Sequence, residues 1–315
     1  MLFSVVVPLH NRERYVARAV ASVLGQSCGD FEILVVDDGS TDGGSEKVEA
    51  IGDPRIRLIT QANAGPGAAR SRGVHESRGE WVAFLDADDL WFPGHLAELA
   101  AMAARFPRAG LLATGYRQGR DPDPAVPPEQ PGRVREIDYF REAARDIGVV
   151  WTSATAVRRE VALTIGDFDP SHAGEDLDYW ARVALVAPVV KSSRPTAYYF
   201  RHGGSLMAER DRGDDNRKLP AALGDIWPST ALLERVRLAP EHADQHEAIE
   251  LYQRGAVYLT MLGHAARGRI EDARKVQRLL PGRHVDKAAL LGLALRLPAP
   301  LWRLALGLRR KLRKP

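Results

Sequence analysis

Residues 81–89 read WVAFLDADD, an apolar run that ends abruptly in acidic residues. Such a continuous apolar run is typical of a strand buried on both faces, as in a parallel sheet. Asp86 and Asp88 stand two positions apart, so both side chains face the same way where the strand ends. Carboxylates gathered in this way repel each other unless a cation lies between them, and Mg²⁺ favours such oxygen ligands. The stretch predicts a buried strand with a divalent-cation site at its end; a solvated acidic turn that caps the following helix is the alternative.

The same alternation of apolar strand and amphipathic helix extends over the first 105 residues. Strands are expected at 3–9, 31–36, 56–60 and 81–85, and helices at 12–24, 45–51, 65–77 and 95–105. This order predicts an α/β fold with a mostly parallel sheet and helices on both faces. Ligands of open α/β sheets bind outside the carboxyl ends of the strands. We therefore expect the polar loops after these strands to form one site.

The remaining two thirds of the chain are less regular. Residues 117–136 are rich in proline and charge and predict a mobile loop. Strands are expected near 149–157 and 188–200, with a helix from about Glu175 between them, and further helices at about 219–236, 242–263, 269–279 and 286–297. The expected organisation is an α/β domain over residues 1–210, with halves at 1–115 and 136–210, followed by a helical C-terminal region over 211–315.

The composition is that of a folded globular chain. With 315 residues, 45% of them hydrophobic and 27% charged, the chain can bury a full core, and it is neither disordered nor a disulfide scaffold. The single cysteine, Cys28, gives no indication of an oxidising compartment. The first residues, MLFSVVVPLHNRER, lack the basic start and cleavage site of a signal peptide, and no uncharged apolar run reaches the roughly 18 residues that span a membrane. A cytoplasmic protein is expected.

Charge is distributed unevenly along the chain. Residues 287–315 contain eight Lys and Arg residues and no acidic residue, which leaves 36 basic and 41 acidic residues elsewhere. A slightly acidic body argues against nucleic acid as a partner. The tail combines leucine-rich pieces with Trp302 and a final RRKLRK, a composition that fits a segment at an anionic membrane surface. A helix packed on the rest of the protein or on a partner chain, with a solvated basic end, is the alternative.

Two loops carry candidate anion- or nucleotide-binding residues. The sequence DDGS at 37–40 follows the second strand and offers the Asp38 carboxylate to a ribose or a base, with Gly39 allowing close backbone approach. The stretch NAGPGAAR at 63–70 is a glycine-rich entry to a helix, whose N–H groups and Arg70 suit phosphate. It is not GxGxxG, so the dinucleotide fingerprint is absent. An ordinary turn and a helix cap with a surface arginine are the alternatives.

Two later segments complete the set of candidates. GEDLDYW at 174–180 opens a helix with acidic residues that complement the helix dipole; alternatively, Asp176 is a general base that faces the site. YYFRHGGS at 198–205 follows a strand and enters a glycine pair. Arg201, His202 and Ser205 are expected to close over a diphosphate, and His202 is also a candidate metal ligand. A structural role for the histidine is the alternative.

In this order, VVVPLHNR, VVDDGSTD, NAGPGAARSRG, FLDADDLW, GEDLDYW and YYFRHGGS resemble the family 2 glycosyltransferases of the GT-A fold, over about the first 205 residues. The resemblance implies a Rossmann-like, mostly parallel sheet flanked by helices, here with a C-terminal helical appendage. It implies a hexosyltransferase that moves a sugar with inversion from a nucleotide-diphosphate sugar, most commonly UDP-linked, to a hydroxyl, with Mg²⁺ or Mn²⁺ as cofactor. The expected setting is bacterial surface-polysaccharide synthesis on a glycan or lipid-linked glycan acceptor, at the inner face of the plasma membrane.

The resemblance also implies roles for individual positions. The nucleotide-sugar would be contacted by Pro8, Asn11, Asp38, Arg70, Asp86, Arg201 and Ser205. The metal would be held by Asp88, Asp89 and His202, and Asp176 matches the catalytic base. His10 stands where a tyrosine is commoner in the family.

Two other functions stay open at this point. An enzyme that loads a sugar onto a polyprenyl phosphate needs no base, because its acceptor is already ionised, so it would tolerate Asp176→Asn. A catalytically silent GT-A module would bind nucleotide or act as a scaffold without transferring sugar. The intact DADD and GED sequences argue against the silent module.

Overall fold

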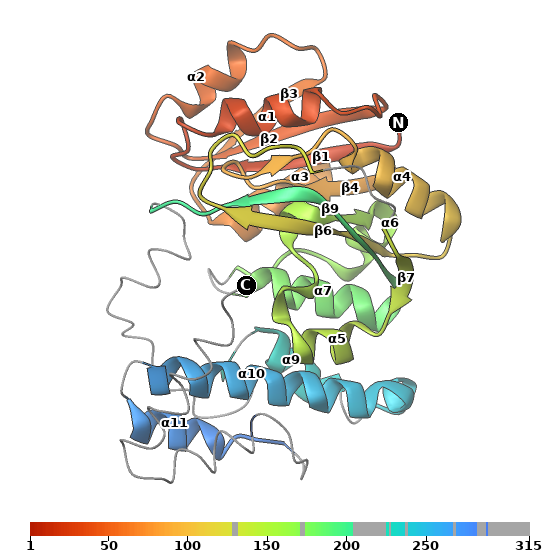
Figure 1. The fold of residues 1–315 in the computed structure, drawn as a ribbon, viewed down its shortest axis with the longest axis vertical. Helices are drawn as coiled ribbons and strands as arrows, with labels where there is room; N and C mark the ends of the chain where they lie inside the picture. Colours follow the sequence, from red (N-terminus) through yellow and green to blue (C-terminus); the bar gives the residue numbers. More distant parts are fainter. Residues whose placement is uncertain are drawn as a thin grey trace. The chain divides into compact units, whose positions relative to one another are not determined.

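The structure is a computed structural model that describes residues 1–127, 132–170, 174–203, 225–226, 228–236, 239–266, 269–281 and 288 (Figure 1). The chain divides into two compact units. Residues 1–139 and 148–215 form the first unit, and residues 140–147 and 216–315 form the second. The expected domain boundary after residue 210 lies outside the described residues and stays a prediction.

Over its described residues, the framework of the first unit is a nine-stranded sheet in the order β3-β2-β1-β4-β8-β6-β9-β5, with β7 also paired to β9. The strands are β1 (Phe3–Leu9), β2 (Phe31–Asp38), β3 (Ile56–Gln61), β4 (Trp81–Phe84), β5 (Leu90–Trp91), β6 (Leu111–Gly119), β7 (Val134–Ile137), β8 (Thr155–Arg158) and β9 (Val189–Phe200). Strands β1 to β4 run parallel, as does β6 with β9, whereas β8, β5 and β7 pair antiparallel to their neighbours. The expected mostly parallel sheet is confirmed.

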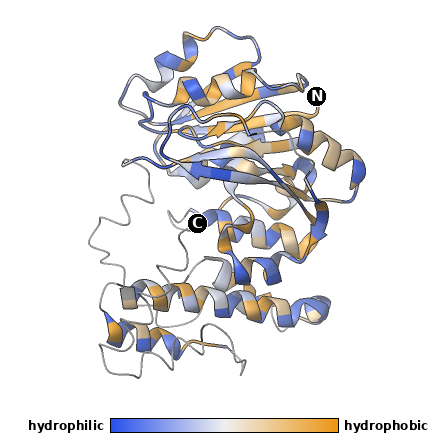
Figure 2. Cartoon of the chain, viewed as in Figure 1, coloured by the Kyte–Doolittle hydropathy of each residue, from blue (hydrophilic) through white to orange (hydrophobic). Residues whose placement is uncertain are grey.

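Helices cover both faces of this sheet (Figure 1). The helices of the first unit are α1 (Val16–Leu24), α2 (Gly44–Glu49), α3 (Pro66–Glu76), α4 (His95–Arg105), α6 (Arg159–Ile165) and α7 (Glu175–Val186). They alternate hydrophobic and hydrophilic residues, whereas β1 and β2 are hydrophobic along most of their length (Figure 2). This difference is expected where both faces of a sheet are covered.

Alternate residues of β1 divide between two cores. The odd-numbered residues from Phe3 to Leu9 pack with α1 and α4. Val6 faces the opposite way and contacts α3, where a Cβ atom added to Gly73 would lie 2.3 Å from Val6 Cγ1. On this second side, the ring of Phe84 lies at the centre of an aromatic cluster made by Phe168, Tyr179 and Trp180. Strands β1 and β4 are thereby held between two apolar layers, and the carboxyl ends of the parallel strands β1 to β4 lie at one edge.

The second unit is helical. It contains residues 140–145 of α5 (Tyr139–Arg145), then α9 (Pro228–Val236), a 3₁₀ segment at Pro240–Gln245, α10 (His246–Ala266) and α11 (Ile270–Gln277). Residues of α10 and α11 form its core: Val257, Met261, Ala265, Ala273 and Val276. The helix expected at 286–297 and the basic tail lie outside the described residues, apart from Ala288. Within the described residues, no helix is both long and apolar enough to cross a membrane.

The interpretation of residues 117–136 as one loop is wrong at both ends. Strand β6 continues to Gly119, paired with β9 as far as Phe200, and β7 begins at Val134, opposite Ser192. These residues are mostly partly or fully exposed, so they lack the apolar run that indicated the buried strands. The strand expected at 149–157 is also shorter, because Thr152–Ala154 form a 3₁₀ turn and β8 begins at Thr155.

Candidate active site

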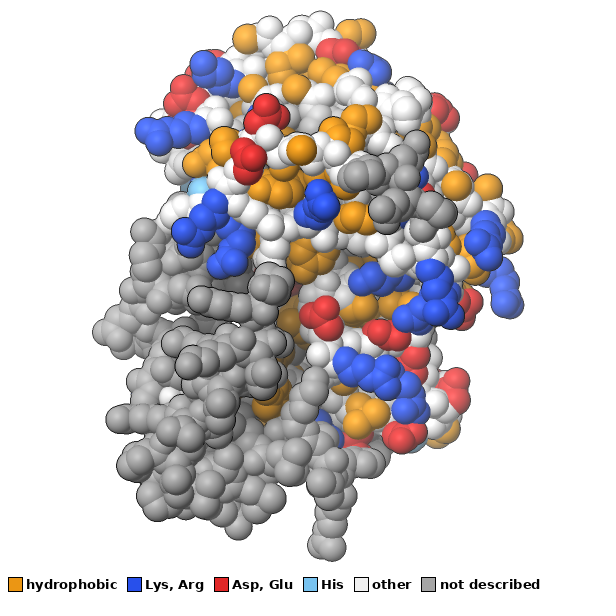
Figure 3. All heavy atoms as spheres, viewed as in Figure 1, with side chains coloured by type: hydrophobic (Ala, Val, Ile, Leu, Met, Phe, Trp, Pro, Cys, Tyr) orange, Lys and Arg blue, Asp and Glu red, His pale blue; other side chains and the backbone are white. Residues whose placement is uncertain are grey.

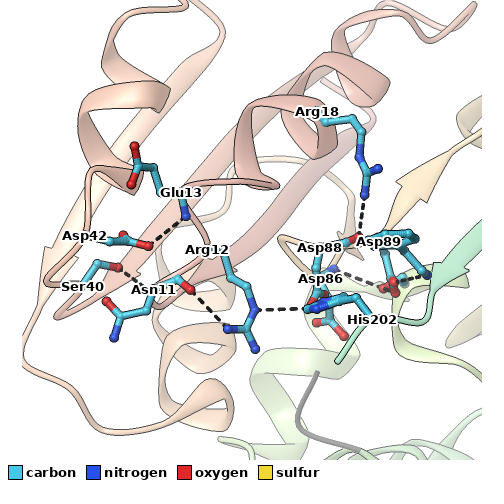
Figure 4. A network of polar contacts seen from close by, with 12 residues as sticks. Asn11, Arg12, Glu13, Arg18, Ser40, Asp42, Asp86, Asp88, Asp89 and His202 are labelled. Carbon is cyan, nitrogen blue, oxygen red and sulfur yellow. Dashed lines mark hydrogen bonds and ion pairs between the residues drawn. The ribbon is translucent and has the colours of Figure 1, made fainter. Parts of the chain in front are cut away.

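The predicted residues of DADD lie at the end of β4, beside the loop that follows β1 (Figure 4). Asp88 Oδ2 accepts a hydrogen bond from Arg12 Nε at 3.2 Å and lies 3.0 Å from His202 Nε2. Burial raises the pKa of Asp88, but the hydrogen bond with His202 and the positive charge of Arg12 outweigh it and hold the pKa below its ordinary value. Asp88 is therefore a carboxylate in this site.

Aromatic rings hold His202 in place. Its imidazole centroid lies 4.5 Å from the ring of Tyr15 and 5.3 Å from the ring of Phe200, on which it stacks. The Arg18 guanidinium lies 4.6 Å from the Phe200 ring centroid and donates to the Asp88 carbonyl at 3.2 Å. The end of β9 and the start of α1 thereby fix the imidazole against Asp88.

Asp89 has a different environment from Asp88. Its Oδ2 accepts from Ser153 Oγ at 2.6 Å and from Trp151 Nε1 at 3.4 Å, and its Oδ1 accepts from the Phe200 N–H at 3.0 Å. Burial, together with the charges of its acidic neighbours in DADD, raises the pKa of Asp89 well above its ordinary value. Both oxygens of Asp89 are hydrogen-bonded within the protein, so in this structure Asp89 ties the DADD turn to β9.

Arg70 joins Asp86 to the start of α7. The Arg70 side chain is 6% exposed, and its Nη2 lies 2.8 Å from Asp86 Oδ1 while its Nη1 lies 3.1 Å from Glu175 Oε1. Burial lowers the pKa of Arg70, but the two negative charges outweigh it and raise the pKa above its ordinary value. The donors of Arg70 that were expected to meet a nucleotide thus pair with two acidic residues, whereas the Asp86 side chain keeps 28% of its surface exposed.

The predicted base, Asp176, is the second residue of α7 and directly follows Glu175. Its Oδ2 accepts from Thr152 Oγ1 at 3.2 Å and its Oδ1 accepts from the Leu177 N–H at 2.8 Å. Burial and the charge of Glu175 raise its pKa above the ordinary value, against the opposing effect of Arg70. A carboxylate with a raised pKa is a stronger proton acceptor, which suits a general base.

Asp38 organises the glycine-rich loop in front of α3. Its Oδ1 accepts from Gln61 Nε2 at 2.8 Å and from the Ala64 N–H at 2.9 Å, and its Oδ2 accepts from the Gly65 N–H at 2.8 Å. Gly39, the next residue, has φ +69°, and a Cβ there would lie 2.9 Å from the Asn63 nitrogen. The DDGS turn and the NAGPG loop are therefore built against each other at the ends of β2 and β3.

Pro8 and Asn11 lie where β1 ends. Pro8 is opposite Val36 in the parallel β1–β2 pair. Asn11 has φ +51°, and its Oδ1 accepts from the Thr41 N–H at 2.8 Å. A left-handed asparagine that uses its side chain to hold a neighbouring turn is a favourable arrangement for this residue type. The structure thus brings the loops after β1, β2 and β4 together, as the strand order predicts.

The segment after β9 is only partly described. The Arg201 N–H donates to the Gly119 carbonyl at 2.7 Å, and the Arg201 residue is exposed. Ser205, the other predicted diphosphate contact, lies outside the described residues. Both basic and acidic side chains lie on the described part of the face in Figure 3.

Sequence reasoning missed the short segment that orients three of the acids. Trp151 and Ser153 hydrogen-bond to Asp89, Thr152 hydrogen-bonds to Asp176, and Ser153 Oγ also accepts from the Asp86 N–H at 3.1 Å. The sequence WTS at 151–153 carries no pattern that distinguishes these residues from the residues of an ordinary strand. Arg12 and Arg18 were missed as well, although two arginines soon after a strand end were a signal that they could neutralise the acidic turn.

Comparisons with known proteins agree with this geometry. The model of the family described as Glycosyl transferase family 2 matches residues 4–166, more than half of the chain. An uncharacterised glycosyltransferase of Nostoc sp. is 34% identical over 219 residues, which cover 65% of this chain and 66% of that protein. The succinoglycan biosynthesis protein ExoO of Rhizobium meliloti is 42% identical over 99 residues, 31% of this chain and 28% of ExoO. The chain thus spans at most about two thirds of the length of these relatives.

The fold is also shared with solved structures. S. aureus TarS 1–349 in complex with UDP-GlcNAc matches with a TM-score of 0.67 at 18% identity, over 89% of this chain and 82% of that one. This likeness confirms the GT-A fold expected from the sequence motifs. Since the family model matches more than half of the chain, including the DADD turn and the loops after β1 and β2, the chain belongs to glycosyl transferase family 2.

Proposed function

We propose that this glycosyltransferase moves a sugar from a nucleotide-diphosphate sugar to a hydroxyl group, with inversion at the anomeric carbon. The observation that carries the proposal is the buried Arg70, which pairs with Asp86 of the DADD turn and with Glu175 beside Asp176. One arginine thereby links the acids at the end of β4 to the residue best suited to be the base. A donor bound at the end of β4 would lie beside a proton acceptor.

The donor proposed for this site is a UDP-sugar. TarS is a protein of the same fold that was solved with UDP-GlcNAc, which supports this choice. In our proposal the loops of Pro8, Asn11 and Asp38 surround the nucleotide, because these loops meet at the carboxyl ends of β1 and β2. Asp86 and the exposed Arg201 are proposed to contact the sugar and the diphosphate. Ser205 is proposed as a further diphosphate contact from its sequence position alone.

The donor set of the site fits a hard divalent cation. Asp88 offers carboxylate oxygens and His202 an imidazole nitrogen, and both types of ligand suit Mn²⁺, while carboxylate suits Mg²⁺. Among the described residues, no group of three or more His, Cys, Asp or Glu side chains is arranged to hold a metal. We therefore propose that Asp88 and His202 hold the ion together with the diphosphate of the donor. Once bound, such an ion would neutralise charge on the departing diphosphate.

In the proposed reaction, the chain's own groups supply the base and the residues that orient it. Asp176 accepts the proton of the acceptor hydroxyl while that oxygen forms a bond to the anomeric carbon. The bond between this carbon and the diphosphate oxygen breaks on the opposite side, and the nucleoside diphosphate leaves with the electron pair. Thr152 and the Leu177 N–H hold the Asp176 carboxylate toward this task. One displacement of this kind inverts the anomeric configuration.

The biological setting that we propose is bacterial polysaccharide synthesis. The partial likeness to ExoO, a succinoglycan biosynthesis protein, supports it. The basic tail at 287–315 supports a site of action at an anionic membrane surface, since each Lys or Arg near such a surface contributes about 1 kcal/mol. The full chain should then float with vesicles containing phosphatidylglycerol, and a variant with Arg309, Arg310 and Lys311 changed to Gln should float less. Equal flotation of both proteins would contradict membrane binding through the tail.

A donor screen tests the proposed reaction. The release of nucleoside diphosphate from UDP-, GDP- and dTDP-sugars would be measured with Mn²⁺, Mg²⁺ or EDTA, on the wild type and on Asp88→Asn. We expect turnover with one class of donor, lost with EDTA and strongly reduced in Asp88→Asn. Asp53→Asn is the matched control, because Asp53 pairs with Arg55 near the start of β3 and not with a residue of the site. Absence of turnover with every donor would contradict the enzyme and favour a silent nucleotide-binding module.

A further inference from the structure

The first unit contains a cavity that shares no residue with the candidate active site. Its volume of about 480 Å³ lies within the range of small-molecule sites. Its walls are the turn between β5 and α4, the middle of β9, Arg117 of β6, two residues of the segment that follows β6, and Ser27. We call this cavity the β9 pocket.

A buried apolar cluster connects the β9 pocket to His202. The cluster consists of Leu90, Phe92, Tyr198 and Phe200. Phe92 lines the pocket, and its ring centroid lies 6.4 Å from that of Tyr198. Phe200, at the end of β9, stacks on the imidazole of His202. The pocket is therefore a separate site, next to the candidate active site but built from other residues.

The β9 pocket carries positive charge. Arg117 and Arg194 line it, and none of its described lining residues is acidic. Arg194 Nη1 lies 3.2 Å from Glu98 Oε2, which balances the charge of Arg194, and a Cβ added to Gly94 would lie 3.3 Å from Arg194 Nη2. Within the described residues, the exposed Arg117 side chain forms no ion pair. A ligand with an acidic group would supply the counter-charge for Arg117.

An irregularity in the sheet builds one wall of the β9 pocket. Strand β9 lies beside β6, where Ala113 is opposite Lys191 but Gly115 is opposite Pro195 (Figure 1). Two steps along β6 thus correspond to four steps along β9. Bulges of this kind re-aim side chains and are frequent beside binding sites. Here the bulge contains Arg194 and leads into Pro195, and both residues line the pocket.

The rest of the lining is mostly apolar. Five of its side chains contain no charged or hydrogen-bonding group: Phe92, Pro93, Val126, Pro127 and Pro195. Phe92 is 6% exposed, whereas Val126 leaves 61% of its surface in contact with solvent. Covering such a side chain is favourable, because burial of apolar surface contributes about 25 cal/mol per Å². An apolar chain or ring placed against Val126 and the prolines would provide that cover.

We propose that the β9 pocket binds an amphipathic anion, a molecule with one phosphate or carboxylate head and an apolar body. Arg117 would neutralise the head, and the apolar lining would contact the body. Guanidinium groups pair well with both phosphate and carboxylate, so the two heads are alternatives of one chemistry. A membrane lipid and a free alkyl or acyl acid both have this chemistry. The inference does not depend on the proposed function, because it uses neither the metal ligands nor the base.

The test measures binding of decyl phosphate to the full-length protein by titration calorimetry, below the micelle concentration and without donor or metal. Arg117→Gln is compared with Arg120→Gln, since Arg120 is also exposed but does not line the pocket. Val126→Asp is compared with Val186→Asp, since Val186 is likewise 61% exposed but lies at the end of α7. All four positions are exposed, so the variants should fold. Inorganic phosphate and the neutral decyl glucoside are the probes that lack the body or the charge.

Decyl phosphate is expected to bind the wild type at one saturable site. Its Kd should rise about threefold to tenfold in Arg117→Gln, through loss of the pairing with the head. It should rise about tenfold or more in Val126→Asp, which replaces apolar contact with a negative charge. The two control variants should bind as the wild type does, and inorganic phosphate and decyl glucoside should bind more weakly than decyl phosphate.

Several results would overturn the proposal. Absence of saturable binding would show that the pocket takes no such ligand. Inorganic phosphate binding as tightly as decyl phosphate would show a simple anion site, and decyl glucoside binding as tightly would show an uncharged apolar site. An equal loss of binding in Arg120→Gln or Val186→Asp would place the ligand elsewhere on the surface.

A second arm identifies the source of the ligand. Flotation with phosphatidylcholine vesicles that contain phosphatidic acid is compared for Val126→Asp and Val186→Asp, which share the same basic tail. Weaker flotation of Val126→Asp would support the proposal with a membrane lipid as the ligand. Equal flotation of the two variants, together with binding of decyl phosphate that depends on Val126, would support it with a free acid as the ligand.

Discussion

At the residue scale, Asp176 is the group whose chemistry is set most clearly by its surroundings. Its carboxylate is held by Thr152 and by the Leu177 N–H, and its pKa is raised by burial and by the charge of Glu175. A base of this kind must lose its own proton before it can accept another. The rate of transfer should therefore depend both on the carboxylate and on its state of ionisation.

We expect Asp176→Asn to lower kcat for transfer to a hydroxyl by about 10²- to 10⁴-fold, because the amide cannot accept the proton. The kcat/KM of the wild type should fall as the pH decreases, with a midpoint above the ordinary pKa range of an aspartate, since the pKa of Asp176 is raised and protonation removes the base. This acid limb should be absent from the residual activity of Asp176→Asn. The measurement is kcat/KM against pH for both proteins. A variant with normal activity would indicate a phosphate acceptor, which needs no base.

The residues of the site differ in how far the sequence could predict them. Asp86 and Asp88 follow an apolar run and Asp176 lies in the acidic first turn of a helix, so the element that carries each of them could be predicted from the sequence. The partners of these acids could not be predicted in the same way. Arg70 lies in a loop-to-helix sequence that suits phosphate, and only the three-dimensional structure shows that it pairs with Glu175, 105 residues away. Ser153 offers no pattern at all, because its role depends on the Asp89 oxygen that it meets.

At the scale of elements, α3 can approach β1 closely because Gly73 has no side chain. A Cβ at this position would lie 2.3 Å from Val6 Cγ1 and 2.7 Å from Val6 Cγ2, both of which belong to a fully buried side chain. The approach matters for the site, since α3 carries Arg70 and begins at the loop that Asp38 holds.

We expect Gly73→Ala to destabilise the first unit by about 1–3 kcal/mol through overpacking against β1. Gly29→Ala is the control, because a Cβ at Gly29 meets nothing within 4 Å. The free energy of unfolding would be measured by urea denaturation. The double variant Gly73→Ala with Val6→Ala should show a favourable coupling energy, because it removes the methyl groups that clash. Equal stability of Gly73→Ala and Gly29→Ala would contradict the close packing of α3 on β1.

The start of α4 contains a buried histidine that lies apart from the proposed chemistry. His95 is fully buried, its Nδ1 lies 2.7 Å from Thr196 Oγ1, and its ring lies 4.2 Å from the ring of Trp91. Burial lowers its pKa from 6.5 to about 3. The unfolded chain therefore binds a proton on His95 below pH 6.5 that the folded chain refuses, so folding is weakened as the pH falls.

We expect this histidine to contribute to acid unfolding of the first unit. Between pH 6.5 and about 3, the free energy of unfolding of the wild type should fall relative to that of His95→Asn. The difference should grow by up to about 1.4 kcal/mol per pH unit. Asparagine keeps a polar atom near the position of Nδ1 and does not titrate. The measurement is urea denaturation of both proteins at several pH values; parallel curves would show that His95 is protonated in the folded protein.

The sequence predicts an element well when the pattern that marks it, such as an apolar run or an acidic first turn, lies within the element itself. Strands β1, β2 and β4 are buried along almost all of their length, so their apolar runs mark them without knowledge of their neighbours, and α7 is marked by its acidic first turn. The second half of β6 and most of β7 pair with β9 through residues that are partly or fully exposed, and this pairing joins positions such as Val134 and Ser192 that are far apart in the chain. Their extended form depends on the partner strand, and the proline-rich sequence between them indicates a loop.

At the scale of the whole molecule, the proposed function requires a metal ion and a donor to complete the site together. Asp88 and His202 lie within hydrogen-bond distance of each other, and the described residues offer no third ligand grouped with them. A divalent ion held by so few protein ligands takes its remaining ligands from water or from a bound diphosphate. The affinity for the ion and the affinity for the nucleotide should therefore be coupled, and each should raise the other by the same factor.

We expect Mn²⁺ alone, or UDP alone with EDTA, to raise the melting temperature of the protein only slightly, and the two together to raise it by more than the sum. At a hundredfold excess over Kd the gain is about 2.7 kcal/mol, which corresponds to a shift of about 5 °C or more. Asp88→Asn should keep the small shift with UDP and lose the excess that Mn²⁺ adds, while Asp53→Asn should behave as the wild type. The measurement is a thermal unfolding series over both ligands.

A large shift with Mn²⁺ alone would indicate a metal site made by the protein itself, and a shift with UDP that is the same in Mn²⁺ and in EDTA would indicate that nucleotide binding is independent of metal. Either result would contradict the shared site, because coupling through the diphosphate requires that neither ligand alone completes it.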